Sequence, residues 1–486
     1  MKKKFIVIII LFGQFLFSQT QIGNSILGMA INDFAGKSVS LSANGSVLAI
    51  SSNGTPDLGQ YKGVVRVFQY VTNNWIQVGN DIIGEAYGDS FGYSIALSAD
   101  GNILAVGAYA NDGGGSESGH VRIYQNTNNN WTQIGADING PWTYIYSGIS
   151  VSLSSDGSIV AIGASNDSSN GFLGGGKVRV YENNNGSWIQ KGSDMSGEAD
   201  DDSFGVSVSL SSDGTTVAIG APGNNSNGNN SGKTYVFGYS IGNWAQIGNG
   251  VSGEGAGDVS GQSVSISANG SIIAIGAPQN NSANGIDAGQ VRVYKNSANT
   301  WTLLGNEING ESAGFRLGYD VSLSGNGEIL TAGTPYGANN AGRVKIFKNI
   351  ANVWTQIGNN IDGETIGDYS SDALAISPDG TTVAIGSPSS GNYFGKTRVF
   401  DLSSILNTSQ HTIEEFSISP NPTQDYFSIS SNTTIESITI YSIMGQKIKD
   451  LNSSNASYCV AELASGNYII QVATPNGIRN TKLIKK

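Results

Sequence analysis

Hydrophobic and polar residues alternate along most of the chain in short runs that predict β-strands. The runs 206–211, 216–221 and 233–237 are strand-like, and the first alternates serine with apolar side chains, as in a strand with one buried face. A tight-turn pair, Asp213-Gly214, separates the first two runs. No long window carries apolar residues at helical spacing. The pattern therefore predicts an all-β protein.

This strand pattern repeats with a period of about 56 residues. Tryptophans that start W-x-x-x-G strands mark six of the repeats: Trp75, Trp131, Trp188, Trp244, Trp301 and Trp354. An inner strand occurs seven times, at 38–42, 94–98, 150–154, 207–211, 263–267, 320–324 and 372–377. Repeats of about this length with four short strands are typical of propeller blades, so we predict a seven-bladed β-propeller.

Each inner strand ends in the same kind of turn. The pairs are Asn44-Gly45, Asp100-Gly101, Asp156-Gly157, Asp213-Gly214, Asn269-Gly270, Asn326-Gly327 and Asp379-Gly380. Both central residues of a type I′ turn need positive φ, which Asn, Asp and Gly tolerate. The turns predict hairpins, and folding explains them without chemistry.

The two ends of the repeat array complement each other. Residues 20–23 match the outer strand at 132–135, whereas the last strand of the array, 396–400, stops one strand short of a full repeat. We expect the N-terminal strand to complete the last blade and close the ring, because closure removes exposed sheet edges.

The N-terminus predicts a cleaved signal peptide. Lys2-Lys3-Lys4 precedes an apolar core, and Ser18 suits cleavage. A membrane anchor is the alternative, but the core is interrupted at 13–14 and falls short of the roughly 20 residues needed to span a bilayer. The predicted organisation is a signal peptide at 1–18, a propeller at 19–402, a linker at 403–412 and a C-terminal domain at 413–486. No transmembrane segment is expected after signal removal.

Composition and charge exclude several functions. A net charge of -12 and a pI near 4.6 argue against a nucleic-acid partner, because phosphate binding needs clustered Lys and Arg. One cysteine, Cys459, excludes an internal disulfide and a cysteine-based zinc site. His120 aligns with polar residues that start a strand, and no Ser-His-Asp set or phosphate loop occurs. We predict no catalytic residue.

Two motifs point to a family. The segment 88–92 (GDSFG) followed by 105–108, and Phe204-Gly205 followed by 219–222, resemble the FG-GAP repeats of integrin-type propellers, with a likeness over 19–402. Such repeats often carry a calcium loop, which the resemblance would imply here. The turn at 211–214 offers one carboxylate where calcium takes about six to eight oxygens. We therefore assign no metal ligand and no cofactor, and calcium stays an alternative without a complete ligand loop.

A ring of acidic residues precedes the inner strands: Asp33, Asp89, Asp202, Asp258 and Asp368. It is open to two interpretations. The ring can bind cations or hydroxyl-rich ligands, or each Asp can accept backbone N–H bonds in its own turn or pair with a recurring arginine. The arginines are Arg66, Arg122, Arg179, Arg292 and Arg398. Recurrence in most repeats favours the structural interpretation.

The repeat is broken most clearly after Trp131, where Trp142, Tyr144 and Tyr146 alternate in a loop. Aromatic faces stack on the C–H faces of sugars, so this loop is a candidate carbohydrate platform. Packing against the neighbouring blade is the alternative. Phe315-Arg316 likewise replaces the Asp-centred pattern in the sixth loop, as weaker evidence for a ligand site.

After the linker, the C-terminal segment resembles the type A sorting domain of the type IX secretion system of Bacteroidota. The resemblance rests on Pro420, Asn421, Pro422, Gly445, Gly466, Tyr468, Lys482 and Lys485. It implies a small immunoglobulin-like β-sandwich and recognition by the type IX secretion machinery. A purely structural immunoglobulin-like module is the alternative.

The sequence therefore predicts a secreted protein, or one on the outer-membrane surface of a Gram-negative bacterium. We expect a monomeric propeller that binds or adheres to an extracellular glycan or a surface protein. The alternative is a polysaccharide-degrading lyase or hydrolase on the same scaffold.

Overall fold

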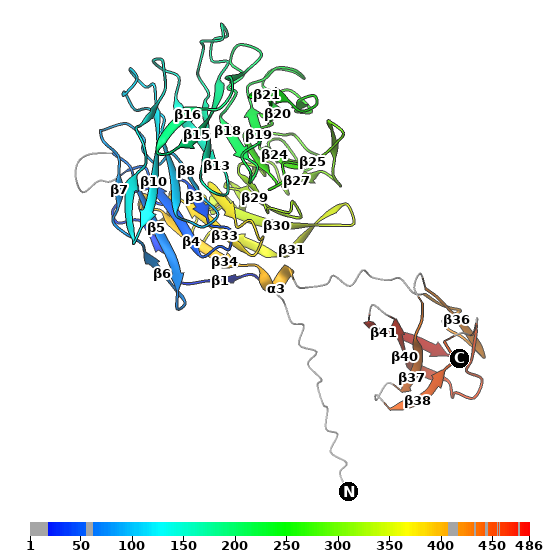
Figure 1. Cartoon of the computed structure of the whole chain (residues 1–486). Helices are drawn as coiled ribbons and strands as arrows, with labels where there is room; N and C mark the ends of the chain where they lie inside the picture. The colour runs from blue at the N-terminus through cyan, green and yellow to red at the C-terminus, as the bar shows by residue number, and fades with distance from the viewer. Residues whose placement is uncertain are drawn as a thin grey trace. The chain divides into compact units, whose positions relative to one another are not determined.

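The computed structural model describes residues 18–54, 62–406, 417–431, 434–442, 446–453, 455, 457–474 and 477–486. Residues 1–17 of the expected signal peptide, and Gly445 of the expected sorting motif, lie outside them. The chain divides into two compact units, Met1–Leu406 and Asn407–Lys486. Both are built of strands, as predicted (Figure 1). Among the described residues, no helix has the length and apolar character needed to cross a membrane.

The first unit contains seven antiparallel sheets, six of five strands and one of four, among the residues the structure describes. Each sheet is named here after its first strand. The first strands are β3 (Val39–Leu41), β8 (Ser94–Leu97), β13 (Ser147–Leu153), β18 (Ser207–Leu210), β23 (Ser263–Ile266), β28 (Val321–Leu323) and β32 (Ala373–Ile376). The second strands are β4 (Val47–Ser52), β9 (Ile103–Ala108), β14 (Ile159–Ala164), β19 (Thr216–Ala221), β24 (Ile272–Ala277), β29 (Ile329–Thr334) and β33 (Thr382–Ser387).

The third and outer strands complete the sheets. The third strands are β5 (Val64–Val71), β10 (His120–Thr127), β15 (Lys177–Asn184), β20 (Lys233–Ser240), β25 (Gln290–Ser297), β30 (Arg343–Ile350) and β34 (Lys396–Asp401). The outer strands are β6 (Asn74–Gln77), β11 (Asn130–Gln133), β16 (Ser187–Gln190), β21 (Asn243–Gln246), β26 (Thr300–Leu303), β31 (Val353–Asp362) and β1 (Thr20–Gln21). Short strands that also pair with the third strands are β7 (Ile82–Ile83), β12 (Ile138–Asn139), β17 (Met195–Ser196), β22 (Val251–Ser252), β27 (Ile308–Asn309) and β2 (Ile26–Leu27).

The β32 sheet contains strands from both ends of the unit. Thr20 and Gln21 of β1 pair with Asp401 and Phe400 of β34, so the described N-terminal strand supplies the outer strand of this sheet. Ser403–Leu406, the first part of the expected linker, instead forms α3. Its Ile405 is buried in the core between the β28 and β32 sheets, because an apolar side chain is stabilised by covering a hydrophobic surface. Two further short helices are α1 (Gly337–Asn340) and α2 (Ser390–Tyr393).

Serines on the first strands join neighbouring sheets. The Ile266 N–H donates to Ser209 Oγ at 3.1 Å, and the Leu323 N–H donates to Ser265 Oγ at 2.9 Å. The same bond joins Leu97 to Ser40, Leu210 to Ser152 and Ile376 to Ser322. The alternating serines therefore satisfy backbone donors along the exposed edge of the next sheet, which would otherwise be left unpaired.

The hairpin turns are linked in a circuit of backbone hydrogen bonds. Ala43 donates to Ala99, and the series continues through Ser155, Ser212, Ala268 and Gly325 to the carbonyl of Pro378, with each N···O distance between 2.8 and 2.9 Å. Proline has no N–H, so the neighbouring Asp379 N–H makes the last bond to Ala43 at 3.3 Å. The circuit thus returns to the residue at which it began.

The six repeat tryptophans fix the outer strands. Each indole N–H donates to a backbone carbonyl of the preceding sheet, as Trp131 does to Val78 and Trp188 does to Ile134, both at 3.0 Å. The other four pairs are Trp75 with Ile22, Trp244 with Lys191, Trp301 with Ile247 and Trp354 with Leu304. Apolar cores between adjacent sheets lie inside these contacts.

The second unit consists of two sheets around one core. One sheet contains β35 (Ser417–Ser419), β36 (Tyr426–Ser430) and β39 (Tyr458–Cys459); the other contains β38 (Lys447–Leu451), β37 (Ser437–Ser442), β40 (Gly466–Thr474) and β41 (Gly477–Lys485). Phe427 and Tyr458 from the first sheet pack with Ile438, Ile470 and Leu483 from the second. Burial of these side chains between the sheets stabilises the unit.

Candidate functional site

The first strands of all seven sheets line a common hollow with two different ends. At the turn end, residues such as Leu41, Ala99 and Pro378 line a small cavity of about 130 Å³. At the other end, which we call the loop end, a cavity of about 350 Å³ is lined by the residues that begin the first strands. A further pocket of about 480 Å³ opens beside it.

One repeat position near the start of each first strand lines the loop end. Its seven residues are Lys37, Tyr93, Ile149, Val206, Gln262, Tyr319 and Asp372. Three residues earlier, each loop holds a residue with left-handed backbone: Phe34, Ser90, Tyr146, Ser203, Val259, Arg316 and Tyr369, with φ between 47° and 59°. Both positions vary in chemical type, unlike the turns. Non-glycine residues in this conformation are uncommon and concentrate at functional sites.

Aromatic residues gather on one side of the loop end. Tyr146 contacts Tyr109 with ring centroids 5.7 Å apart, and Tyr109 contacts Tyr93 at 4.7 Å. Beyond the ion pair described next, Tyr336 contacts Tyr319 at 6.5 Å and Tyr369 at 5.6 Å. The β18 and β23 sheets place Ser203, Val206, Val259 and Gln262 at the equivalent positions, so the aromatic arc covers only part of the loop end.

An ion pair stands in the middle of the arc. Lys37 Nζ lies 3.0 Å from Asp372 Oδ2 and 5.5 Å from the centre of the Tyr93 ring. Burial alone would lower the pKa of Lys37, but the Asp372 carboxylate raises it above its ordinary value. Burial, together with Asp372, also raises the pKa of Tyr319 to about 12. Lys37 and Asp372 line both the loop-end cavity and the adjoining pocket.

Asp320 follows Tyr319 in the chain, at a repeat position where most of the other sheets carry serine. Its Oδ2 accepts the Leu374 N–H at 2.7 Å, and its Oδ1 accepts the Ser263 hydroxyl at 2.8 Å. It therefore keeps the bonding role of the serines but brings a charge. Enclosure from solvent raises the pKa of Asp320 to about 6, although these hydrogen bonds favour the charged form.

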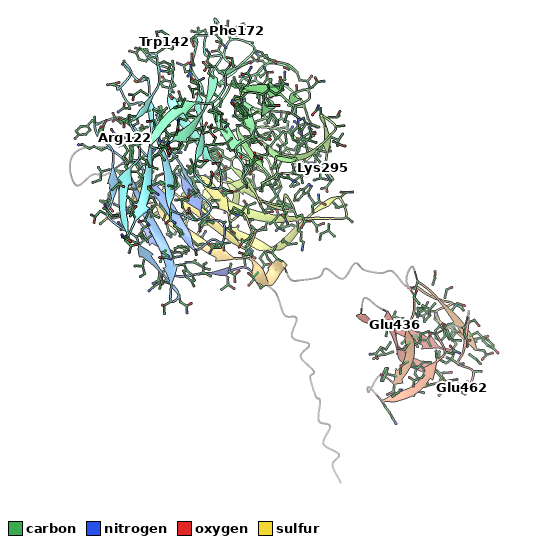
Figure 2. The ribbon with its side chains drawn as sticks, viewed as in Figure 1. Arg122, Trp142, Phe172, Lys295, Glu436 and Glu462 are labelled. Carbon is green, nitrogen blue, oxygen red and sulfur yellow. The ribbon has the colours of Figure 1, made fainter. Side chains whose placement is uncertain are left out.

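The expected ligand residues occupy different environments. Trp142 and Tyr144 are 60% and 52% exposed, and Trp142 lies at the outer edge of the unit in the view of Figure 2. Tyr146 belongs to the aromatic arc, and Arg316 stacks over Tyr336 at 4.9 Å. Phe315 is half-buried beside it. Two of the five expected residues thus join the loop end directly.

The acidic ring makes the contacts of the structural interpretation. Asp202 Oδ2 accepts the N–H groups of Glu198 and Ala199 at 2.8 and 3.0 Å, and its other oxygen accepts the Asn224 amide. Similar backbone bonds reach Asp33, Asp89, Asp258 and Asp368, and all five side chains are buried. Of the recurring arginines, Arg66 lies 3.5 Å from Asp33. These bonds engage the carboxylates inside their own loops.

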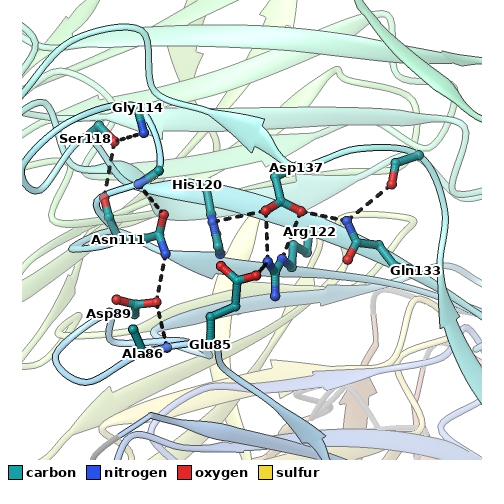
Figure 3. Close-up of polar contacts among 12 residues, drawn as sticks. Glu85, Ala86, Asp89, Asn111, Gly114, Ser118, His120, Arg122, Gln133 and Asp137 are labelled. Carbon is teal, nitrogen blue, oxygen red and sulfur yellow. Dashed lines mark hydrogen bonds and ion pairs between the residues drawn. The ribbon is translucent and has the colours of Figure 1, made fainter.

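A polar cluster surrounds His120 (Figure 3). Ligand atoms of Glu85, His120 and Asp137 lie within 4.8 Å of one another, which is compatible with a cation. Arg122 pairs with both carboxylates, lying 2.9 Å from Asp137, and so already supplies their positive partner. Burial and the nearby Arg122 lower the pKa of His120. We therefore assign no metal to this cluster.

In the second unit, the expected sorting residues that the structure describes lie near the end of β41. Asn421 donates to the Lys482 carbonyl at 2.7 Å and accepts the Ile484 N–H at 2.8 Å. Gly466 pairs with Lys485 across β40 and β41. Tyr468 lies two residues further along the same ladder, paired with Leu483, and Pro420 and Pro422 flank Asn421. The motif is therefore one local surface rather than scattered positions.

Comparison with protein families agrees with this geometry. Residues 84–124 and 195–237 match the FG-GAP repeat, and residues 417–486 match the secretion system C-terminal sorting domain. The chain carries FG-GAP repeats and a type IX sorting domain. The sorting domain directs export to the cell surface or the extracellular space in Bacteroidota, through the type IX secretion machinery. No curated protein matches the chain.

Sequence reasoning missed the ion pair and most of the arc. Lys37 and Asp372 lie 335 positions apart, and neither belongs to a recognisable motif. A signal was nevertheless present, because both occupy one column of the repeat alignment. Comparing which columns vary between repeats, rather than which recur, would have singled them out.

Proposed function

We propose that the protein is a secreted or surface-attached, monomeric, seven-bladed propeller that binds an extracellular glycan or surface protein. The circuit of turn bonds and the pairing of β1 with β34 support a ring closed by the N-terminal strand. Closure of this kind leaves no exposed sheet edge and gives a rigid frame for loops.

The uneven loop end carries the binding proposal. Seven equivalent positions hold isoleucine, valine and glutamine on one side, and tyrosine, lysine and aspartate on the other. Folding alone gives no reason for this asymmetry, since the same backbone accepts both sets. Partly exposed aromatic rings around a few polar groups are typical of ligand sites. Trp142 and Tyr144 would extend such a site as an outer platform.

The test is a glycan-array and surface-protein binding screen of residues 19–406, with calcium and with chelator. The same incubations are assayed for new reducing or unsaturated sugar ends. We expect binding without cleavage. The absence of any glycan or protein ligand would contradict the binding proposal.

A polysaccharide-degrading enzyme is the second candidate. Asp320 favours it, because a carboxyl with a pKa of about 6 beside a cavity is suited to proton transfer near neutral pH. New sugar ends in the same screen, lost in Asp320→Asn, would establish it.

Export provides a separate test of the domain organisation. We propose that residues 1–18 act as the signal peptide and that 413–486 act as the sorting domain. Deleting 413–486 should leave the propeller in the periplasm, as followed by cell fractionation. Unchanged delivery to the surface would contradict the assignment.

A further inference from the structure

The pocket of about 480 Å³ at the loop end is formed by three sheets. Its lining residues come from the β3, β28 and β32 sheets. Its walls include Phe34, Tyr336 and Tyr369, and its polar lining includes Lys37, Asn53 and Asp372. The volume falls in the range of small-molecule sites. It therefore suits a short stretch of ligand rather than a folded domain.

Three aromatic walls leave open ring surface. Phe34, Tyr336 and Tyr369 are all only half-buried. Arg316 covers one face of Tyr336, and Tyr369 packs against Tyr336 at an interplanar angle of 73°. The two rings are therefore closer to perpendicular than to parallel, and they do not stack face to face. Exposed aromatic faces of this kind bind flat C–H surfaces.

The polar groups of the pocket can form further hydrogen bonds. Asn53 Oδ1 is buried and has no hydrogen-bond partner among the described residues. Lys37 and Asp372 keep 29% and 16% of their side-chain surface exposed while bonded to each other. A lysine, a carboxylate and an amide together can both donate to and accept from hydroxyl groups.

The charges of the pocket argue for a neutral ligand. Lys37 and Asp372 are its charged lining residues, and their charges cancel. An anionic ligand would have to separate this pair and leave Asp372 facing a like charge, which is costly in a partly desolvated site. A neutral hydroxyl-rich ligand can bond to both groups without separating them.

Backbone strain also marks this side of the ring. Ser371 has φ of 89°, where the other six loops have glycine. Its hydroxyl is fully buried and has no partner within the described part of the chain. A left-handed non-glycine residue costs about 1–2 kcal/mol, and such strain is kept mainly at functional sites. Ser371 immediately precedes Asp372 in the chain and follows Tyr369 by two residues.

We infer that this pocket binds a neutral hexose unit of an extracellular glycan, with the sugar ring on Tyr369 and its hydroxyls on Asp372, Lys37 and Asn53. The inference rests on the proposed binding function and names its ligand class. It assigns specificity to residues of the β3, β28 and β32 loops.

The repeats supply variants that the fold already accepts. Tyr369→Ser introduces the residue that Ser90 and Ser203 provide in the same left-handed conformation. The double variant Lys37→Ile/Asp372→Gln introduces residues found at equivalent positions, Ile149 and Gln262, and leaves no unpaired charge. Val259→Ser, at the equivalent position on the far side of the ring, is the matched control.

The exported full chain is titrated by calorimetry with maltohexaose, cellohexaose and laminarihexaose, and with an alginate hexasaccharide as the anionic arm. We expect at least one neutral hexasaccharide to bind. Tyr369→Ser should weaken it about tenfold or more, and the double variant similarly, whereas Val259→Ser should change Kd less than about twofold.

Three results would overturn the inference. They are binding of alginate alone, equal affinity of Tyr369→Ser and Val259→Ser, and no binding of any of the four oligosaccharides. In each case the broader proposal survives if the array or protein screen yields a ligand. Failure of that screen as well would remove both.

Discussion

The turn end and the loop end of the first unit are built by the same seven sheets but differ in how much they vary. At the turn end, each sheet repeats an Asn-Gly or Asp-Gly turn, and the turns share one hydrogen-bond circuit. At the loop end, equivalent positions hold residues as different as Lys37, Val206 and Tyr319. Repetition therefore marks what the fold requires, and variation marks where the seven sheets can acquire a binding site.

The test with the largest expected effect introduces valine at a left-handed backbone position of each end, in two separate variants. Gly214, at the turn end, has φ of 65°, and a Cβ there would lie 2.6 Å from Ile159 Cδ1 of the preceding sheet. Gly214→Val should lower the free energy of unfolding by roughly 2 to 5 kcal/mol, from backbone strain and overpacking. Urea unfolding measures it.

The matched variant at the loop end is Ser203→Val. Val259 already holds φ of 49° at the equivalent position, so we expect a change within about 1 kcal/mol. Equal losses for Gly214→Val and Ser203→Val would mean that the two ends are equally constrained, and the comparison would fail.

The second test uses Asp320, a charged residue at a position where most of the other sheets carry serine. The pKa of Asp320 in the folded protein, about 6, lies above its value of 3.8 in the unfolded chain. This carboxyl therefore contributes stability below a pH of about 4, which is lost as the pH rises through about 6. Asp320→Ser should gain stability relative to the natural chain between pH 4 and pH 8, by up to about 3 kcal/mol.

Unfolding curves of Asp320→Ser and of the natural chain at pH 4 and pH 8 measure this gain in stability. Asp213 at the turn end is the control. Desolvation alone would raise its pKa, but bonds from the Ser211 hydroxyl and the Thr215 N–H lower it. The stability from Asp213 is thus present between pH 4 and pH 8 and is lost only in stronger acid, so the difference between Asp213→Asn and the natural chain should be nearly the same at both pH values. The same trend in both variants would contradict the assigned shifts.

The repeated features were accessible from sequence because each obeys a local rule. The Asp-Gly turns, the Trp strands and the acidic loops recur at fixed spacing, and local geometry explains them. The circuit through Ala43 and Pro378 and the Lys37–Asp372 pair are not local. They arise where sheets distant in sequence meet, and the type IX sorting surface around Asn421 depends likewise on a strand about 60 residues later.

A third, smaller effect concerns the strained loop of the β32 sheet. Ser371→Gly restores the residue of the other six loops at this left-handed position. We expect an increase in unfolding free energy of about 1 kcal/mol, because glycine has no Cβ to strain and no buried hydroxyl to leave unpaired. If the pocket uses this strain, affinity for its hexose ligand should fall. A loss of stability would show that the serine is well accommodated.

The smallest expected effect on stability is that of Trp142→Ala, which tests whether a residue outside the arc belongs to the site. Trp142 is 60% exposed, so its removal should leave the melting temperature almost unchanged, as should Ile189→Ala on an outer strand, where the side chain is 53% exposed. Both lose apolar surface, but Trp142 alone lies on a loop that leads to Tyr146 and the arc. Weaker glycan binding in Trp142→Ala, with Ile189→Ala unchanged, would extend the site outward from the pocket. A fall of several kcal/mol in the free energy of unfolding would instead identify Trp142 as a packing residue, and the asymmetry of the loop end would then narrow to the pocket itself.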